Sequence, residues 1–180
     1  AVVVMQHGFL LNKAYYSEIL THLASHGFIV VAAQMYSSFS IPPSIADETE
    51  DATKISTWAR GDLTGILPAG VTPAPEAFGL MGHSRGAQIA FWQAERDTTS
   101  TVGALVGLDP VDGSPLGGAR VTDGGITGMR PTLVIGTGLG PQSPGPFQPS
   151  CAPEDDGHKA FWSAVNAPAW RVVTVEHGHM

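Results

Sequence analysis

The chain has 180 residues, of which 43% are hydrophobic and 14% charged, a globular composition with enough length to bury one core. Its formal net charge is -7 with nine Lys and Arg in all, which argues against a nucleic-acid partner because phosphate binding needs clustered cations. The single cysteine, Cys151, can form no internal disulfide, and no apolar run approaches the roughly 20 residues of a transmembrane segment.

Six short apolar runs alternate with helix-like stretches along the chain. The runs are continuous, which is typical of strands buried on both faces in a parallel sheet. We therefore expect an α/β fold with a mostly parallel sheet, helices on both faces and right-handed crossovers. Strands are expected at Val2–Met5, Phe28–Ala33, Phe78–Met81, Val102–Leu108, Thr132–Ile135 and Trp170–Val175, and helices at Tyr15–Ala24, Ala46–Arg60, Arg85–Ala94 and His158–Val165.

Two stretches resist regular structure. Residues 68–76 form a Pro-rich connector, and residues 136–153 contain four Gly and five Pro, too many for a helix or a central strand. A long loop of this kind is often functional in a compact domain, although a plain surface excursion fits the composition equally well. Since no repeat or domain boundary is visible, we expect residues 1–180 to form a single domain.

A G-x-S-x-G motif at Gly82–Gly86 stands between the third strand and the third helix. The turn is so tight that the residues two before and two after Ser84 must be small. It raises the serine hydroxyl above the carboxyl edge of the sheet, at the N-terminus of the next helix. Such motifs also arise in ordinary glycine-rich turns, but the strand before it and the helix after it indicate a nucleophile.

A serine nucleophile needs a base to take its proton and an acid to orient that base. In this strand–turn–helix context the chain order is serine, acid, histidine, which leaves His158, His177 and His179. We expect His158, at a helix start, to be a surface or capping residue. His177 and His179 both follow the last strand, and motif order does not separate them. Their H-x-H pattern also suggests zinc, but no third ligand has metal-site spacing, so we predict no metal.

The acid is expected at the end of a strand. Residues 136–153 hold no carboxylate, whereas Gly107–Gly113 offers Asp109 and Asp112. Asp109 stands directly at the carboxyl end of the strand, and Asp112 falls three residues into a turn, where aspartate usually caps the backbone. Asp109 is therefore the better acid.

Acyl transfer also needs donors for the developing oxyanion. The start of the helix supplies the backbone N–H of Arg85. The loop after the first strand should supply the second, which we assign to Phe9, because Gly8 lets the chain turn close to the nucleophile. His7 precedes the nucleophile and is expected to shape this loop. No organic cofactor is needed for this chemistry.

Beyond these motifs, the chain resembles chlorophyllases over nearly all its residues. The stretch around Ser84 is shared with many lipases, whereas Gly107–Gly113 and Gly136–Pro141 are more particular to chlorophyllases. Further matching stretches are His7–Leu11, Ala24–Val30, Cys151–Pro153 and Gly178–Met180. The resemblance implies an α/β-hydrolase fold and a serine carboxylesterase that hydrolyses the phytyl ester of chlorophyll, an apolar small-molecule substrate, to chlorophyllide and phytol.

The resemblance also implies the roles of several residues. The acid matches Asp109, and the base matches His179 rather than His177. A phytyl tail requires a long apolar groove, for which four side chains are candidates by position, although each fits the core equally well. They are Phe9, Leu10, Leu139 and Phe147.

Members of this family are longer, so the resemblance implies a catalytic core truncated at both ends. Without additional strands before Val2, the run 28–33 would be an exposed apolar edge strand. Two rival functions share these features. One is a general carboxylesterase, lipase or polyester hydrolase, and the other is an inactive homologue that only binds pigment. The sequence indicates no oligomeric state.

Overall fold

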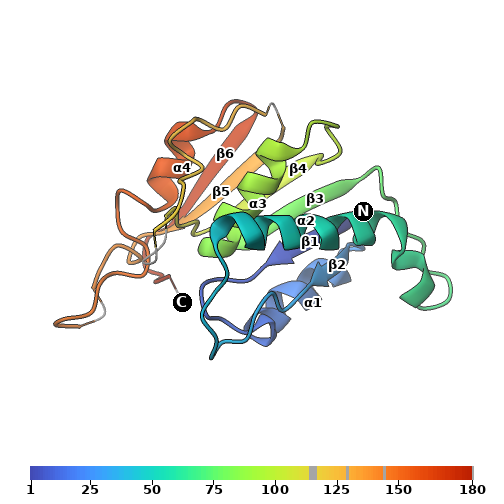
Figure 1. Ribbon diagram of the computed structural model, residues 1–180, viewed down its shortest axis with the longest axis horizontal. Coiled ribbons are helices and arrows are strands. Elements are labelled where there is room, and N and C mark those ends of the chain that lie inside the picture. Colours follow the sequence, from blue (N-terminus) through green and yellow to red (C-terminus); the bar gives the residue numbers. More distant parts are fainter. Residues whose placement is uncertain (114–116, 129, 144, 180) are drawn as a thin grey trace.

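Six parallel strands form one sheet in the order β2-β1-β3-β4-β5-β6 in the computed structural model, which describes residues 1–113, 117–128, 130–143 and 145–179 (Figure 1). All six predicted strands form, so the expected parallel sheet is confirmed. Their bounds are β1 Val2–Gln6, β2 Ile29–Ala32, β3 Phe78–His83, β4 Ala104–Leu108, β5 Thr132–Thr137 and β6 Ala169–Thr174.

The helices cover both faces of the sheet. Right-handed crossovers place α2, α3 and α4 on one face, because the chain steps in one direction from β2 to β6; α2 and α3 cross in front of the sheet in Figure 1. The step from β1 to β2 runs the other way, which places α1 on the opposite face. The helices are α1 Ser17–Ser25, α2 Ile45–Gly61, α3 Arg85–Arg96 and α4 His158–Ala164, with 3-10 turns η1 Lys13–Tyr16 and η2 Leu63–Ile66.

The main core lies between the sheet and the helices α2, α3 and α4. Val4 and Leu80, on the central strands β1 and β3, point into it. The ring of Phe91 on α3 meets that of Phe161 on α4 edge to face, with centroids 4.9 Å apart. This packing holds the middle of α3 against α4, and both aromatic side chains are completely buried.

The strand order reverses between β1 and β3, which has a direct consequence for function. The chain leaves β1 for the edge strand β2 and returns across β1 to β3. The loop after β1 and the turn after β3 therefore meet at the carboxyl edge of the sheet, the place where α/β proteins form their sites. β2 is an edge strand, as expected for the run 28–33, and all four of its residues are partly exposed.

Three local expectations were wrong. Gly136 continues β5 and does not open the long loop: a Cβ there would lie 2.2 Å from the ring of His158. His158 is accordingly buried at 6% exposure beside this strand and is not a surface residue. The first helix was expected to begin at Tyr15, but Tyr15 lies in η1 before the helix begins and is 76% exposed.

No helix within the described ranges combines the length and apolar character needed to cross a membrane.

Candidate active site

Ser84 occupies a strained turn between β3 and α3. Its backbone angles are φ 55° and ψ -127°, a region that side-chain-bearing residues rarely adopt unless the surrounding structure enforces it. A Cβ on Gly82 would lie 2.2 Å from the carbonyl oxygen of Gly86, and one on Gly86 would lie 2.3 Å from that of Gln6. Both positions flanking the serine therefore require glycine, as the motif predicts.

Asp109 follows β4 and is held by hydrogen bonds around its carboxylate. Oδ1 accepts from the backbone N–H of Thr137 at 2.8 Å. Oδ2 accepts from the Thr137 hydroxyl at 2.7 Å and from Nδ1 of His179 at 2.7 Å. Burial alone would raise the pKa of Asp109, but these donors outweigh it and place the pKa below its ordinary value. The carboxylate is therefore held in its ionised form.

His179 is the histidine that the structure brings to Asp109. Its side chain is 7% exposed and that of Asp109 is 4% exposed, whereas His177 is exposed. Because Nδ1 of His179 donates to the carboxylate, Nε2 is the ring nitrogen left to accept a proton. No hydrogen bond joins the Ser84 hydroxyl to His179 in the described chain, but both residues line one cavity.

Asp112, the other carboxylate of this segment, serves the structure of the chain that follows it. It accepts hydrogen bonds from the side chain of Gln88 at 2.7 Å and from the backbone N–H of Val121 at 3.1 Å. Thr122 donates to it from both its backbone and its hydroxyl, at 2.8 and 2.6 Å. These donors occupy the carboxylate in organising the backbone, the role expected for a turn aspartate.

The oxyanion loop, residues 7–11, is tethered by two tyrosine hydroxyls. The N–H of Gly8 donates to Tyr16 at 2.9 Å, and the N–H of Leu10 donates to Tyr36 at 3.4 Å. Between them, the N–H of Phe9 donates to no other residue of the described chain, and neither does that of Arg85. The two predicted oxyanion donors are thus available to a ligand.

Gly8 brings this loop against the nucleophile. A Cβ at position 8 would lie 3.3 Å from the Cβ of Ser84 and 3.0 Å from Nδ1 of His83. His7 holds the loop from behind: its Nδ1 donates to the Gly8 carbonyl at 2.9 Å, and its Nε2 accepts from the N–H of Met35 at 3.0 Å. His7 therefore shapes the loop, as the sequence suggests.

A cavity of about 310 Å³ opens beside Ser84 and His179. Phe9, Leu11 and Val111 contribute apolar surface to it, and the free thiol of Cys151 lines it as well.

Of the other three predicted groove residues, Leu139 alone lines a described hollow beside this cavity. Leu139 lines an adjoining hollow of about 290 Å³ together with His179 and Cys151. Leu10 and Phe147 are not part of the described lining of either hollow, and Phe147 is fully exposed. Leu11 and Val111, which sequence reasoning missed, point into the cavity beside Ser84 instead.

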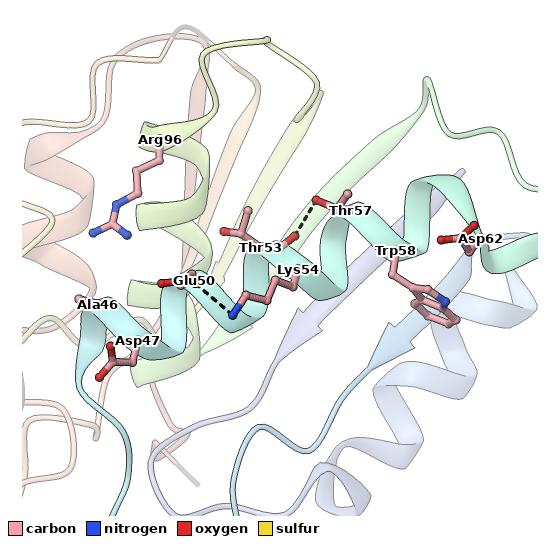
Figure 2. Close-up of a pocket in the computed structure, with 9 residues that line it drawn as sticks. All are labelled: Ala46, Asp47, Glu50, Thr53, Lys54, Thr57, Trp58, Asp62 and Arg96. Carbon is pink, nitrogen blue, oxygen red and sulfur yellow. Dashed lines mark hydrogen bonds and ion pairs between the residues drawn. The ribbon is translucent and has the colours of Figure 1, made fainter.

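A larger hollow, of about 670 Å³, follows the outer side of α2. Figure 2 shows its lining side chains along that helix, with Arg96 of α3 at one end. Lys54 forms ion pairs within the helix, with Glu50 at 3.1 Å and Asp51 at 2.9 Å. This hollow shares no lining residue with the Ser84 cavity, and the charged residues that line it are exposed to solvent, so it offers no comparable chemistry.

Two sets of contacts near the site could not be predicted from the sequence. The guanidinium of Arg85 forms an ion pair with Glu48 of α2 at 2.8 Å, donates to the carbonyl of Pro43 at 2.7 Å and lies 5.9 Å from the ring of Phe9. Burial raises the pKa of Glu48, and the charge of Arg85 offsets part of that rise. The second contact joins His83 to Tyr16 at 2.8 Å. Both pair residues from separate elements.

Within the described chain, no group of three or more His, Cys, Asp or Glu residues is placed to hold a metal ion.

Comparison with known proteins gives consistent results at the level of family. A family model described as Chlorophyllase matches residues 1–180. The chain is 37% identical to Chlorophyllase-2 of Arabidopsis thaliana over 190 residues, which cover 99% of this chain and 59% of that relative. It is 36% identical to Chlorophyllase-1, chloroplastic, of Citrus sinensis, covering 99% of this chain and 54% of the relative. The chain thus spans between half and two thirds of these proteins.

Solved structures show the fold. The alpha/beta hydrolase GrgF from Penicillium sp. sh18 superposes with a TM-score of 0.73 at 12% identity, covering 99% of this chain and 82% of that protein. DcsB, solved in complex with its substrate analogue, gives 0.71 at 15% identity, covering 99% and 83%. The six-stranded parallel sheet and its helices therefore form an α/β-hydrolase fold.

Proposed function

Because the chain belongs to the chlorophyllase family, we propose that it is a serine carboxylesterase in which Ser84 is the nucleophile, His179 the base and Asp109 the acid. One observation carries this proposal. The imidazole of His179 is bonded to the buried carboxylate of Asp109 at 2.7 Å and lines the same cavity as Ser84. Three residues far apart in the sequence thus meet at the edge of the sheet, in the chain order that this fold uses.

In the first half of the reaction, Oγ of Ser84 attacks the ester carbonyl while Nε2 of His179 takes the serine proton. The negative charge that develops on the carbonyl oxygen is stabilised by the N–H groups of Phe9 and Arg85, each contributing about 3–4 kcal/mol to lowering the barrier. Asp109 keeps the imidazole oriented and stabilises its positive charge. The hydrogen bonds around Asp109 support this role, since they lower its pKa and keep it ionised.

The first half ends when the alcohol leaves with the proton held by His179 and an acyl group remains on Ser84. Water then attacks this acyl-enzyme, His179 takes the proton of the water, and the free carboxylate departs as the serine hydroxyl is restored.

We propose the phytyl ester of chlorophyll as the substrate, with chlorophyllide and phytol as products. The names of the relatives, which are chlorophyllases, support this assignment. The cavity beside Ser84 is compatible with an apolar ester, because the side chains of Phe9, Leu11 and Val111 line it. Leu139 lines the adjoining hollow, where it can extend the apolar surface. Leu10 and Phe147 remain predictions from position alone.

The test is to incubate the protein with chlorophyll, extract the pigments and separate them by chromatography, with short p-nitrophenyl esters assayed in parallel. We expect chlorophyllide and phytol from the wild type and neither product from Ser84→Ala. Turnover of short esters without any chlorophyllide would instead identify a general carboxylesterase, lipase or polyester hydrolase. Tight pigment binding with no turnover of either substrate would identify a binding module.

A further inference from the structure

We propose that Tyr16 and His83 are positioning residues. Through one directional chain of hydrogen bonds, they fix the oxyanion loop relative to the base His179. This inference rests on the proposed esterase function and adds to it two residues that the three-residue catalytic set does not contain. The chain of bonds runs from the N–H of Gly8 through the Tyr16 hydroxyl and the His83 ring to the backbone carbonyl of His179.

The direction of each bond follows from the groups involved. A carbonyl oxygen only accepts, so Nε2 of His83, 2.9 Å from the carbonyl of His179, must carry a hydrogen. In a neutral imidazole, Nδ1 of His83 is then an acceptor, and the Tyr16 hydroxyl at 2.8 Å must donate to it. The oxygen of Tyr16 in turn accepts from the N–H of Gly8 at 2.9 Å. Every donor and acceptor in the chain is therefore assigned.

The protonation states of both side chains agree with this assignment. Burial lowers the pKa of His83 to about 4, with a further lowering by the nearby His179, so the ring is neutral at physiological pH. Burial also raises the pKa of Tyr16 to about 12, so its hydroxyl keeps the hydrogen that it donates. A charged His83 would oppose catalysis, because its ring centroid lies 4.7 Å from that of His179, which must itself become positive.

Three parts of the proposed machinery converge on this one imidazole. His83 precedes the nucleophile Ser84 directly in the chain. Through Tyr16 it is linked to Gly8, the residue before the proposed oxyanion donor Phe9. Its other ring nitrogen holds the backbone of the base. An error of about 1 Å in the placement of such groups can lower a rate about 100-fold, so these bonds bear on turnover.

The first experiment measures kcat and KM for p-nitrophenyl butyrate in matched variants. Tyr16→Phe deprives Gly8 and His83 of their partner and should lower kcat about tenfold with little change in KM. Tyr15→Phe is the control, because the Tyr15 side chain is 76% exposed, and it should behave as wild type. His83→Leu should lose more than Tyr16→Phe, whereas His83→Gln should retain part of the activity, since an amide carries an acceptor beside a donor.

A double-mutant cycle separates positioning from general structural damage. If Tyr16 and His83 act through one chain, Tyr16→Phe should cost clearly less in the His83→Leu background than in the wild type, where it breaks the bond to His83 as well as the bond to Gly8. Independent, multiplying losses in kcat would overturn the proposal, and so would wild-type kcat in Tyr16→Phe. Thermal unfolding of each variant is measured alongside, and losses that follow stability instead of the cycle would also overturn it.

A second measurement tests the proposal without any variant. Nitrogen NMR of the His83 ring should report a neutral imidazole with its hydrogen on Nε2 at pH 7, and the opposite tautomer would overturn the chain. This result does not depend on turnover. If the wild type hydrolyses no ester, the proposed function fails on that assay, while the tautomer of His83 still decides whether the bonds exist as described.

Discussion

The buried ion pair between Arg85 and Glu48 should stabilise the turn that presents the nucleophile. The side chains are 4% and 1% exposed, and Nε lies 2.8 Å from Oε2. Glu48→Gln keeps the shape of the side chain but leaves the guanidinium without a counter-charge. Removing one partner of a buried pair costs about 3–5 kcal/mol. At roughly 2–4 °C per kcal/mol for a chain of this size, the unfolding midpoint should fall by about 6–20 °C.

Urea unfolding followed by circular dichroism gives the free energy of unfolding directly. The control is Glu50→Gln, which removes an exposed partner of Lys54 on the same helix and should cost less than about 1 kcal/mol. The double variant Glu48→Leu/Arg85→Met should be more stable than Glu48→Gln, because no charge is left buried. Equal stability of Glu48→Gln and Glu50→Gln would refute this reasoning.

Four further outcomes are expected. Gly86→Ala should lose about 1–3 kcal/mol or more in urea unfolding, because its Cβ would lie 2.3 Å from the Gln6 carbonyl oxygen; an unchanged midpoint contradicts this. Asp109→Asn should lower kcat for p-nitrophenyl butyrate about 10⁴-fold, and a loss below tenfold would exclude Asp109 as the acid. Folding lowers the pKa of Asp109, so the ionised carboxylate stabilises the fold above the unfolded pKa of about 3.9, and this stabilisation is lost as the pH falls through the folded pKa. Between pH 7 and 3 the free energy of unfolding of Asp109→Asn should therefore fall less steeply than that of the wild type. Parallel curves for the two proteins would contradict the lowered pKa. Cys151 lines the cavity, so a bulky maleimide on its thiol should inhibit hydrolysis of chlorophyll more than hydrolysis of p-nitrophenyl acetate. Full modification without any effect on either rate contradicts this, and Cys151→Ser is the control that the maleimide cannot modify.

Much of the fold could be predicted because its signals are local. Continuous apolar runs identify the six strands, and β3 and α3 flank the G-x-S-x-G motif in the way that the turn requires. The same local logic places Phe9, Gly8 and Asp109 at strand ends, which a parallel sheet gathers at one edge. Sequence order alone left His177 and His179 equivalent, and the bond to Asp109 distinguishes them.

The parts that could not be predicted depend on packing between distant segments. Gly136 resembles the glycines of the loop that follows it, and only the His158 ring lying against it explains its place in a strand. In the sequence, Glu48 resembles the surface carboxylates of α2. The structure shows it buried in an ion pair with Arg85 of α3. Leu10 and Phe147 stay predictions from position, because the direction of a loop side chain depends on backbone angles that the sequence does not specify, here φ 55° and 75°.

The central claim is that Ser84 is a nucleophile activated by His179, and a fluorophosphonate tests it most directly. Incubation followed by peptide mapping should find one covalent adduct, on Ser84, with ester hydrolysis lost in proportion to labelling. The adduct should be absent in Ser84→Ala and form far more slowly in His179→Ala, while His177→Ala labels like the wild type. An unlabelled Ser84 in a protein that still hydrolyses esters would contradict the account.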